Sequence, residues 1–127
     1  MSGFMVLVDT AVFIAHFRGK SDDTFKRLLF GDEIFLSPFV RIELLQGVKK
    51  SEASLVEQVL GGLVPIPAIG DLFGEAEMIL RRARQQGMVL GIIDLLIAAQ
   101  ANLNRCPVYS FDKVFDQLAL FKLVAVL

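Results

Sequence analysis

FMVLVDTAVFIAHF, residues 4–17, is the stretch that decides the fold, because it joins a strand to a helix at one acidic residue. The short apolar run 4–8 is typical of a buried strand, and residues 9–17 have the apolar spacing of a helix. Asp9 therefore lies at the point where the strand ends and the helix begins.

The rest of the chain repeats this alternation. Further strands are expected at residues 33–36, 107–110 and 122–126, an extended segment at 63–67, helices at 21–31, 38–48, 51–61, 71–86 and 92–104, and a loop or short helix at 111–118. We expect Ser21 to cap the helix that follows it, Ser37 and Pro38 to begin the next, and Ser51 to begin another. The alternation predicts one α/β domain, residues 1–127, with a largely parallel sheet.

Composition excludes several classes of protein. Apolar residues make up 54% of the chain. This is above the roughly 45–50% usual in soluble domains, and it predicts doubly buried strands, an apolar surface for a partner, or both. No apolar run approaches the ~18 residues of a membrane span, and residues 1–8 lack the basic flank and length of a signal peptide. The single cysteine, Cys106, excludes an intrachain disulfide and predicts a reducing, cytoplasmic location.

The types of side chain present also restrict any metal site. One histidine and one cysteine are too few for a His/Cys zinc site within one chain. Any metal must therefore be held mainly by carboxylate oxygen, which favours Mg²⁺ or Mn²⁺.

Four acidic residues are candidates for such a site, although each has an ordinary structural explanation. Asp9 and Asp94 are each placed to be the N-cap of a helix, and Asp112 to serve a turn. Glu43 is placed to pair with Arg41 or to face solvent. Asp94 is the least easily explained, because the apolar helix predicted around it should be central and buried, and burying an unpaired carboxylate is costly.

The four acids are more informative together than singly. Two follow strand ends and two lie on apolar helices, so they could converge at one edge of the sheet. Crowded carboxylates repel one another, and their pKa values rise unless a cation lies among them. A cluster that stays ionised at neutral pH therefore implies a divalent metal, which can lower the pKa of a water molecule for attack on phosphorus. The set predicts metal-assisted phosphodiester hydrolysis.

Four segments, in order, resemble the PIN-domain family, and more narrowly the VapC-type toxins of bacterial toxin–antitoxin modules. They are VLVDTAVFIA (6–15), SPFVRIELLQG (37–47), GIIDLLIAA (91–99) and VYSFDKVF (108–115). The resemblance implies a PIN-like three-layer α/β/α fold with a largely parallel central sheet, and endoribonuclease activity. It also implies that the catalytic residues and the Mg²⁺ or Mn²⁺ ligands are the same four acids, Asp9, Glu43, Asp94 and Asp112.

Further residues gain roles from this resemblance. The hydroxyls of Thr10 and Ser110 match positions beside the acids, where they would bond a carboxylate, a metal-bound water or a phosphate. Cap or turn bonding explains both hydroxyls equally well. Asp116 competes with Asp112, because residues four apart share a helix face. We keep Asp112, which is nearer the strand end and belongs to a Ser-x-Asp pattern.

Charge gives a weaker indication of RNA binding. The net charge of −1 does not provide the basic surface usual for a nucleic-acid-binding protein. The candidates for contacts to RNA phosphates are Arg41, Lys49, Arg81 and Arg82. For each basic group taken alone, a solvated helix face is the simpler explanation.

The resemblance also implies a partner. A toxin must be silenced, and the apolar surplus, with eleven phenylalanines, would suit a groove for the helix of a cognate antitoxin. Homodimer formation would use such a surface equally well. The alternative functions are a PIN-fold interaction module with little catalysis, and a PIN nuclease of RNA processing that has no antitoxin.

Overall fold

The computed structural model describes residues 4–127, so the first three residues of the predicted domain, and of the segment compared with a signal peptide, lie outside it. The elements are, in chain order, β1 (Val6–Val8), α1 (Thr10–Phe17), α2 (Asp23–Phe30), β2 (Ile34–Leu36), α3 (Pro38–Gly47), α4 (Ala53–Gly61), β3 (Val64–Pro65), α5 (Leu72–Gln85), α6 (Ile92–Leu103), β4 (Val108–Tyr109) and α7 (Lys113–Leu120).

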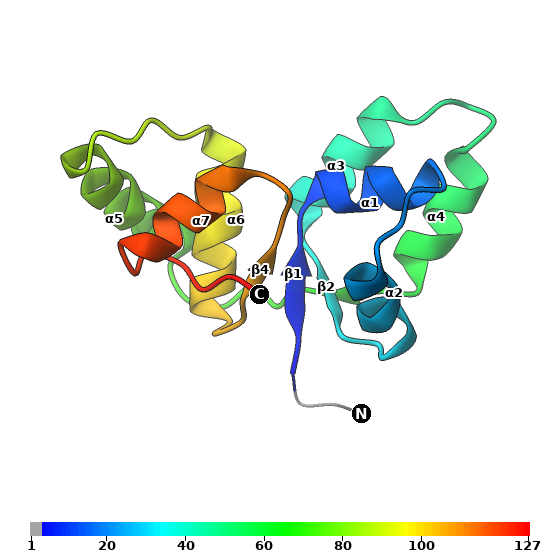
Figure 1. Ribbon diagram of the computed structural model, residues 1–127, viewed down its shortest axis with the longest axis horizontal. Coiled ribbons are helices and arrows are strands. Elements are labelled where there is room, and N and C mark those ends of the chain that lie inside the picture. The colour runs from blue at the N-terminus through cyan, green and yellow to red at the C-terminus, as the bar shows by residue number, and fades with distance from the viewer. Residues whose placement is uncertain (1–3) are drawn as a thin grey trace.

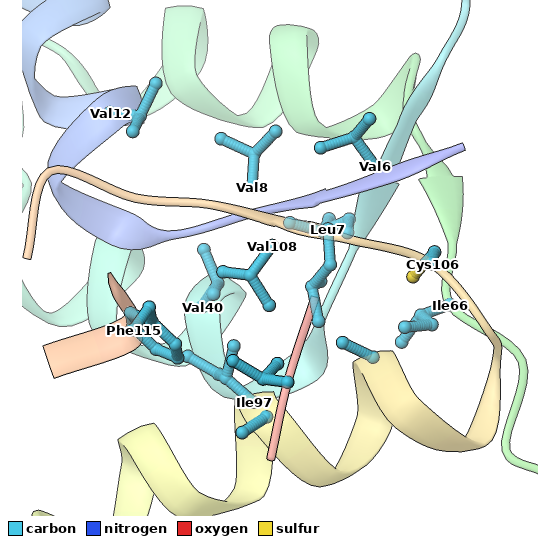
Figure 2. Packing of buried hydrophobic residues seen from close by; sticks show 14 of the residues in the cluster. Val6, Leu7, Val8, Val12, Val40, Ile66, Ile97, Cys106, Val108 and Phe115 are labelled. Carbon is cyan, nitrogen blue, oxygen red and sulfur yellow. The ribbon is translucent and has the colours of Figure 1, made fainter. Parts of the chain in front are cut away.

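The four strands form one parallel sheet in the order β3-β2-β1-β4. In Figure 1, α5, α6 and α7 lie on one side of β1, and α1 to α4 lie on the other. All three residues of β1 are 0% exposed, as expected of a parallel strand with both faces covered. Val6 and Val8 point to one side of β1, whereas Leu7 points to the other, toward Ile97 of α6 (Figure 2). The predicted α/β/α fold with a parallel sheet is confirmed.

Helix α6 is the central helix that the sequence predicted. Its seven consecutive residues from Leu95 to Ala101 are all buried. Helix α5 packs extensively along it. Such all-round burial explains why the α6 sequence is apolar on every face. None of the helices in residues 4–127 is both long enough and apolar enough to cross a bilayer.

Two predicted helix starts were wrong by one or two residues. Helix α2 is capped by Asp22 rather than Ser21, since the Asp22 carboxylate accepts a hydrogen bond from the Phe25 amide at 2.7 Å. Both are good capping residues, and the carboxylate forms the bond here. Helix α4 begins at Ala53 rather than Ser51, after a turn, and has no side-chain cap. Ser37 caps α3 as predicted, with Pro38 in the first turn.

The predicted strand at 122–126 is reduced to a single bridge between Val126 and Val108. The chain leaves α7 through Lys122, whose φ of 58° turns the backbone sharply. It then reaches β4 only through bonds from the Val108 amide to the Ala125 carbonyl and from the Leu127 amide to the Val108 carbonyl. For residues 111–118 the sequence predicts a loop or a short helix, and the structure has helix α7 from Lys113 onward.

Candidate active site

The four predicted acids are contributed by four separate segments of the chain. Asp9 follows β1, and Asp112 follows β4, the neighbouring parallel strand. The carboxyl ends of neighbouring parallel strands meet at the same edge of a sheet, so these two side chains reach the same place. Asp94 is the third residue of α6, and Glu43 is the sixth residue of α3.

Electrostatic interactions show that the four acids lie within range of one another. The pKa of Asp9 is raised, first by burial and then by the charges of Glu43 and Asp112. Burial also raises the pKa of Asp94 to about 6, and the charges of the other three acids add to the rise. Asp116 is not among the charges that raise either pKa. The predicted four acids are therefore near enough for their charges to act on Asp9 or Asp94, although no three acidic side chains in residues 4–127 are close enough together to hold a metal ion.

Two hydroxyls hold the carboxylates in place. Thr10 Oγ1 donates to Glu43 Oε1 at 2.6 Å, which connects the start of α1 to α3. Ser110 Oγ donates to Asp9 Oδ2 at 2.7 Å and accepts from the Asp112 amide at 3.0 Å. The bond from Ser110 lowers the pKa of Asp9 and so opposes the effect of burial. Both hydroxyls therefore bond a carboxylate, which is one of the roles predicted for them.

The ordinary structural explanations fail for Asp9 and Asp94 and hold in part for Glu43. Asp9 stands at the N-cap position of α1, but its side chain makes no capping bond. Asp94 is not a cap either, because Gly91 occupies that position and Asp94 lies inside the first turn of α6. Arg41 pairs with Glu57 at 2.8 Å and not with Glu43, but the other explanation for Glu43 holds, because this residue is exposed to solvent.

Asp112 keeps its ordinary explanation. One of its oxygens, Oδ1, accepts from the Val114 amide at 3.0 Å and so caps helix α7. The expected turn chemistry is therefore present at Asp112. A cap uses one carboxylate oxygen and leaves the other free, so it is compatible with a second role.

The fit to a metal ion rests on the chemistry of the donors. As the side chains stand, no three Asp, Glu, His or Cys side chains in residues 4–127 are close enough together to hold a metal ion. Four carboxylates nevertheless supply the hard oxygen ligands that Mg²⁺ and Mn²⁺ prefer. Their mutual repulsion raises the pKa values of Asp9 and Asp94, and a cation among them would reverse that effect.

The predicted RNA-binding cations do not form one surface. Arg41 is used in its ion pair with Glu57, and Arg81 pairs with Glu77 at 2.5 Å on the same helix. Lys49 lines a pocket together with Glu43, whereas Arg82 lines a different pocket between α5 and the C-terminal segment.

Sequence reasoning missed two charged residues, Arg18 and Glu52, which line the pocket that contains Glu43 and Lys49. Arg18 follows α1 and Glu52 precedes α4. Nothing in their local sequence distinguishes them from ordinary surface charges. They can be identified as pocket residues only once the packing of α1 against α3 and of α3 against α4 is known.

Comparisons with known proteins identify the family and the fold. The PIN domain family model matches residues 6–120. Ribonuclease VapC19 of Mycobacterium tuberculosis is 32% identical over 100 residues, which cover 76% of this chain and 80% of the relative. Two solved structures are similar in fold. The crystal structure of VapBC2 from Rickettsia felis, bound to a DNA fragment from its promoter, has a TM-score of 0.81 and 20% identity over 98% of each chain. A toxin-antitoxin complex from Klebsiella pneumoniae has a TM-score of 0.73 and 19% identity over 95% of this chain and 96% of that one.

Proposed function

This chain belongs to the PIN-domain family, and on that premise we propose that it is a metal-dependent endoribonuclease, the toxin of a VapBC-type toxin–antitoxin module. The observation that carries the proposal is the gathering of four acids from four segments at the carboxyl end of β1 and β4. Similarity to a relative named a ribonuclease supports RNA as the substrate. Likeness to toxin–antitoxin complexes supports an antitoxin partner. Homodimer formation and a cytoplasmic location stay predictions.

The chain's own residues have distinct tasks in this mechanism. A bound Mg²⁺ or Mn²⁺ would supply positive charge at the scissile phosphate and lower the pKa of the attacking water. Asp9, Asp94 and Asp112 would hold that cation. Ser110 keeps the Asp9 carboxylate oriented and favours its ionised form. Glu43, oriented by Thr10 through one oxygen, would use the other to orient the water or to bind a second cation.

Two neighbouring acids provide a matched test of this site. We expect wild-type protein, freed of any partner, to cleave a mixed RNA pool with Mn²⁺ or Mg²⁺ and to stop when EDTA is added. Asp112→Asn should lower kcat/KM by roughly 100-fold or more. Substitution of a residue that only hydrogen-bonds to a metal ligand already lowers metal affinity or activity by about 10–100-fold, and we expect a larger loss for a ligand itself. Asp116→Asn should leave kcat/KM within about twofold. Asparagine caps a helix as well as aspartate does, so α7 should keep its start.

The outcome of this assay separates the two aspartates. A larger loss in Asp116→Asn than in Asp112→Asn would make Asp116 the fourth acid. If wild-type protein cleaves no RNA with either metal, the nuclease proposal fails.

The toxin assignment has its own test in living cells. Induced expression of wild-type protein should arrest growth of the bacterial host, whereas Asp9→Asn should be harmless and Asp116→Asn should stay toxic. Co-expression of the small protein encoded beside this gene should restore growth, and the two proteins should purify together. Harmless expression of the wild type together with a failure to co-purify would remove the toxin assignment and leave the nuclease proposal standing.

A further inference from the structure

A pocket of about 200 Å³ lies beside the acidic cluster, between α1, α3 and α4. These helices are neighbours on one side of the sheet (Figure 1). Apolar side chains, among them Phe17, Leu44 and Val56, form part of its wall. Glu43 lines the pocket and also belongs to the acidic cluster. The pocket therefore adjoins the place where the RNA bond would be cut.

We propose that this pocket binds one unpaired nucleobase of the RNA substrate, and that it selects a base carrying an exocyclic amino group. This inference rests on the endoribonuclease function proposed above and adds a residue-level basis for substrate choice. Recognition of single-stranded RNA commonly uses bases that are turned out of the stack and read at their edges.

The size and lining of the pocket suit a single base. Pockets for drug-sized ligands measure about 300–1,000 Å³, so this smaller one admits one ring system rather than a whole nucleotide. Phe17 is only partly buried and supplies an aromatic surface for stacking. Stacking of a base on an aromatic side chain contributes roughly 1–3 kcal/mol and does not depend on which base is bound.

Glu52 provides the selectivity. Its side chain is partly buried in the pocket lining, and within residues 4–127 it forms no hydrogen bond or ion pair. An ionised carboxylate only accepts hydrogen bonds. Adenine, guanine and cytosine offer an amino group to such an acceptor, whereas uracil offers only its N3–H, which lies between two carbonyl oxygens that repel a carboxylate. The free carboxylate therefore favours an amino-bearing base over uracil.

Two cations at the same pocket suit the phosphates on either side of the bound base. Arg18 and Lys49 are exposed and make no ion pair within the described part of the chain. Phosphate contacts position a nucleic acid without selecting its sequence. The two cations without an ion pair favour a ligand that carries phosphates. Because Glu43 belongs to both the pocket and the acidic cluster, the pocket also adjoins the proposed cleavage site, and both points favour RNA over a protein segment as its occupant.

A glycine in the pocket lining allows the pocket to be filled without disturbing the fold. Gly47 is the last residue of α3, and a Cβ added there meets no atom within 4 Å. Gly47→Leu should add a bulky side chain at the pocket lining, where the open space leaves room for it. Gly61, the last residue of α4, has equally open surroundings and is not part of the pocket, so Gly61→Leu is the matched control. Both changes raise helix propensity, so neither should impair folding.

The test measures binding without cleavage. Fluorescent five-nucleotide RNAs, all uridine except for a central A, G, C, U or abasic position, are titrated in EDTA, and anisotropy gives each Kd. Wild-type protein should bind at least one of the amino-bearing RNAs roughly 5- to 150-fold more tightly than the all-uridine RNA, the range expected for one well-formed base contact. Gly47→Leu and Glu52→Gln should lose most of that preference, and Gly61→Leu should keep it.

Equal affinity of the wild type for all five RNAs, or an unchanged preference in Gly47→Leu, overturns the inference. If Gly47→Leu loses its protein partner while keeping its base preference, the pocket belongs to that partner and the inference is also overturned. Because no metal is present and no bond is cut, failure of the nuclease proposal appears separately, as absent cleavage in the RNA assay.

Discussion

Asp94→Asn should abolish RNA cleavage and at the same time raise the Tm of the metal-free protein at pH 7. Loss of a carboxylate that touches the reacting centre should lower kcat/KM by roughly 1,000-fold or more. The stability effect has the opposite sign because partial burial, and after it the negative charges of the other three acids, disfavours the ionised Asp94 carboxylate and raises its pKa to about 6. Asparagine has nearly the same shape and carries no charge, so it removes this repulsion.

The stabilisation by Asp94→Asn should depend on pH in a defined way. The folded protein binds the Asp94 proton more tightly than the unfolded chain, whose carboxyl titrates near the ordinary value of 3.8. Stability of the wild type therefore falls as pH rises from about 4 through about 6, where the folded protein loses that proton. The difference in Tm between variant and wild type should be small at pH 4, widen through pH 6 and level off above pH 7.

Two controls connect this behaviour to the cluster. Asp116→Asn, which removes an exposed acid outside the cluster, should show no such widening. Addition of Mg²⁺ or Mn²⁺ at pH 7 should raise the Tm of the wild type more than that of Asp94→Asn, because a ligand that binds only the folded state stabilises it. A difference in Tm that is constant across pH, or cleavage that survives the substitution, would remove Asp94 from the site.

Much of the fold followed from local patterns in the sequence. The apolar run that forms β1 has no alternative to burial, and Ser37 followed by Pro38 is a strong local signal for a helix start. Asp9 and Asp112 were identifiable because each follows a strand, which is a local feature of the sequence. The two strands are parallel neighbours, so their carboxyl ends, and with them the two acids, lie close together. Local information of this kind was sufficient for strands β1, β2 and β4 and for two of the four acids.

Other features depend on tertiary contacts that no short segment encodes. The residues 122–126 have the apolar composition of a strand, but their pairing is limited by where α7 ends and the chain turns at Lys122. Asp94 lies inside α6 rather than at its cap because Gly91, at the end of the preceding loop, occupies the cap position. The pocket between α1, α3 and α4 brings Arg18 together with Lys49 and Glu52, which follow it by about 30 residues. No local sequence pattern connects these three residues.

A buried polar pair connects the helices that carry two of the acids. Ser37, which is 0% exposed, donates a hydrogen bond from Oγ to Gln100 Oε1 at 2.6 Å and accepts one from the Phe39 amide at 3.2 Å. The start of α3 is thereby joined to the middle of α6. This contact helps to fix α3, which carries Glu43, against α6, which carries Asp94.

Ser37→Ala should therefore lower the free energy of unfolding by roughly 2–4 kcal/mol, measured by urea denaturation. Loss of the cap accounts for about 0.5–2 kcal/mol, and leaving the buried Gln100 amide without its partner accounts for about 1–3 kcal/mol. Ser54→Ala, at an exposed position of α4, is the control and should change stability by less than about 0.5 kcal/mol. In the Ser37→Ala background, Gln100→Leu should restore part of the loss, because it replaces the stranded amide with an apolar side chain. If Ser37→Ala is as mild as Ser54→Ala, the pair does not hold α3 to α6, and the relative placement of Glu43 and Asp94 must depend on apolar packing alone.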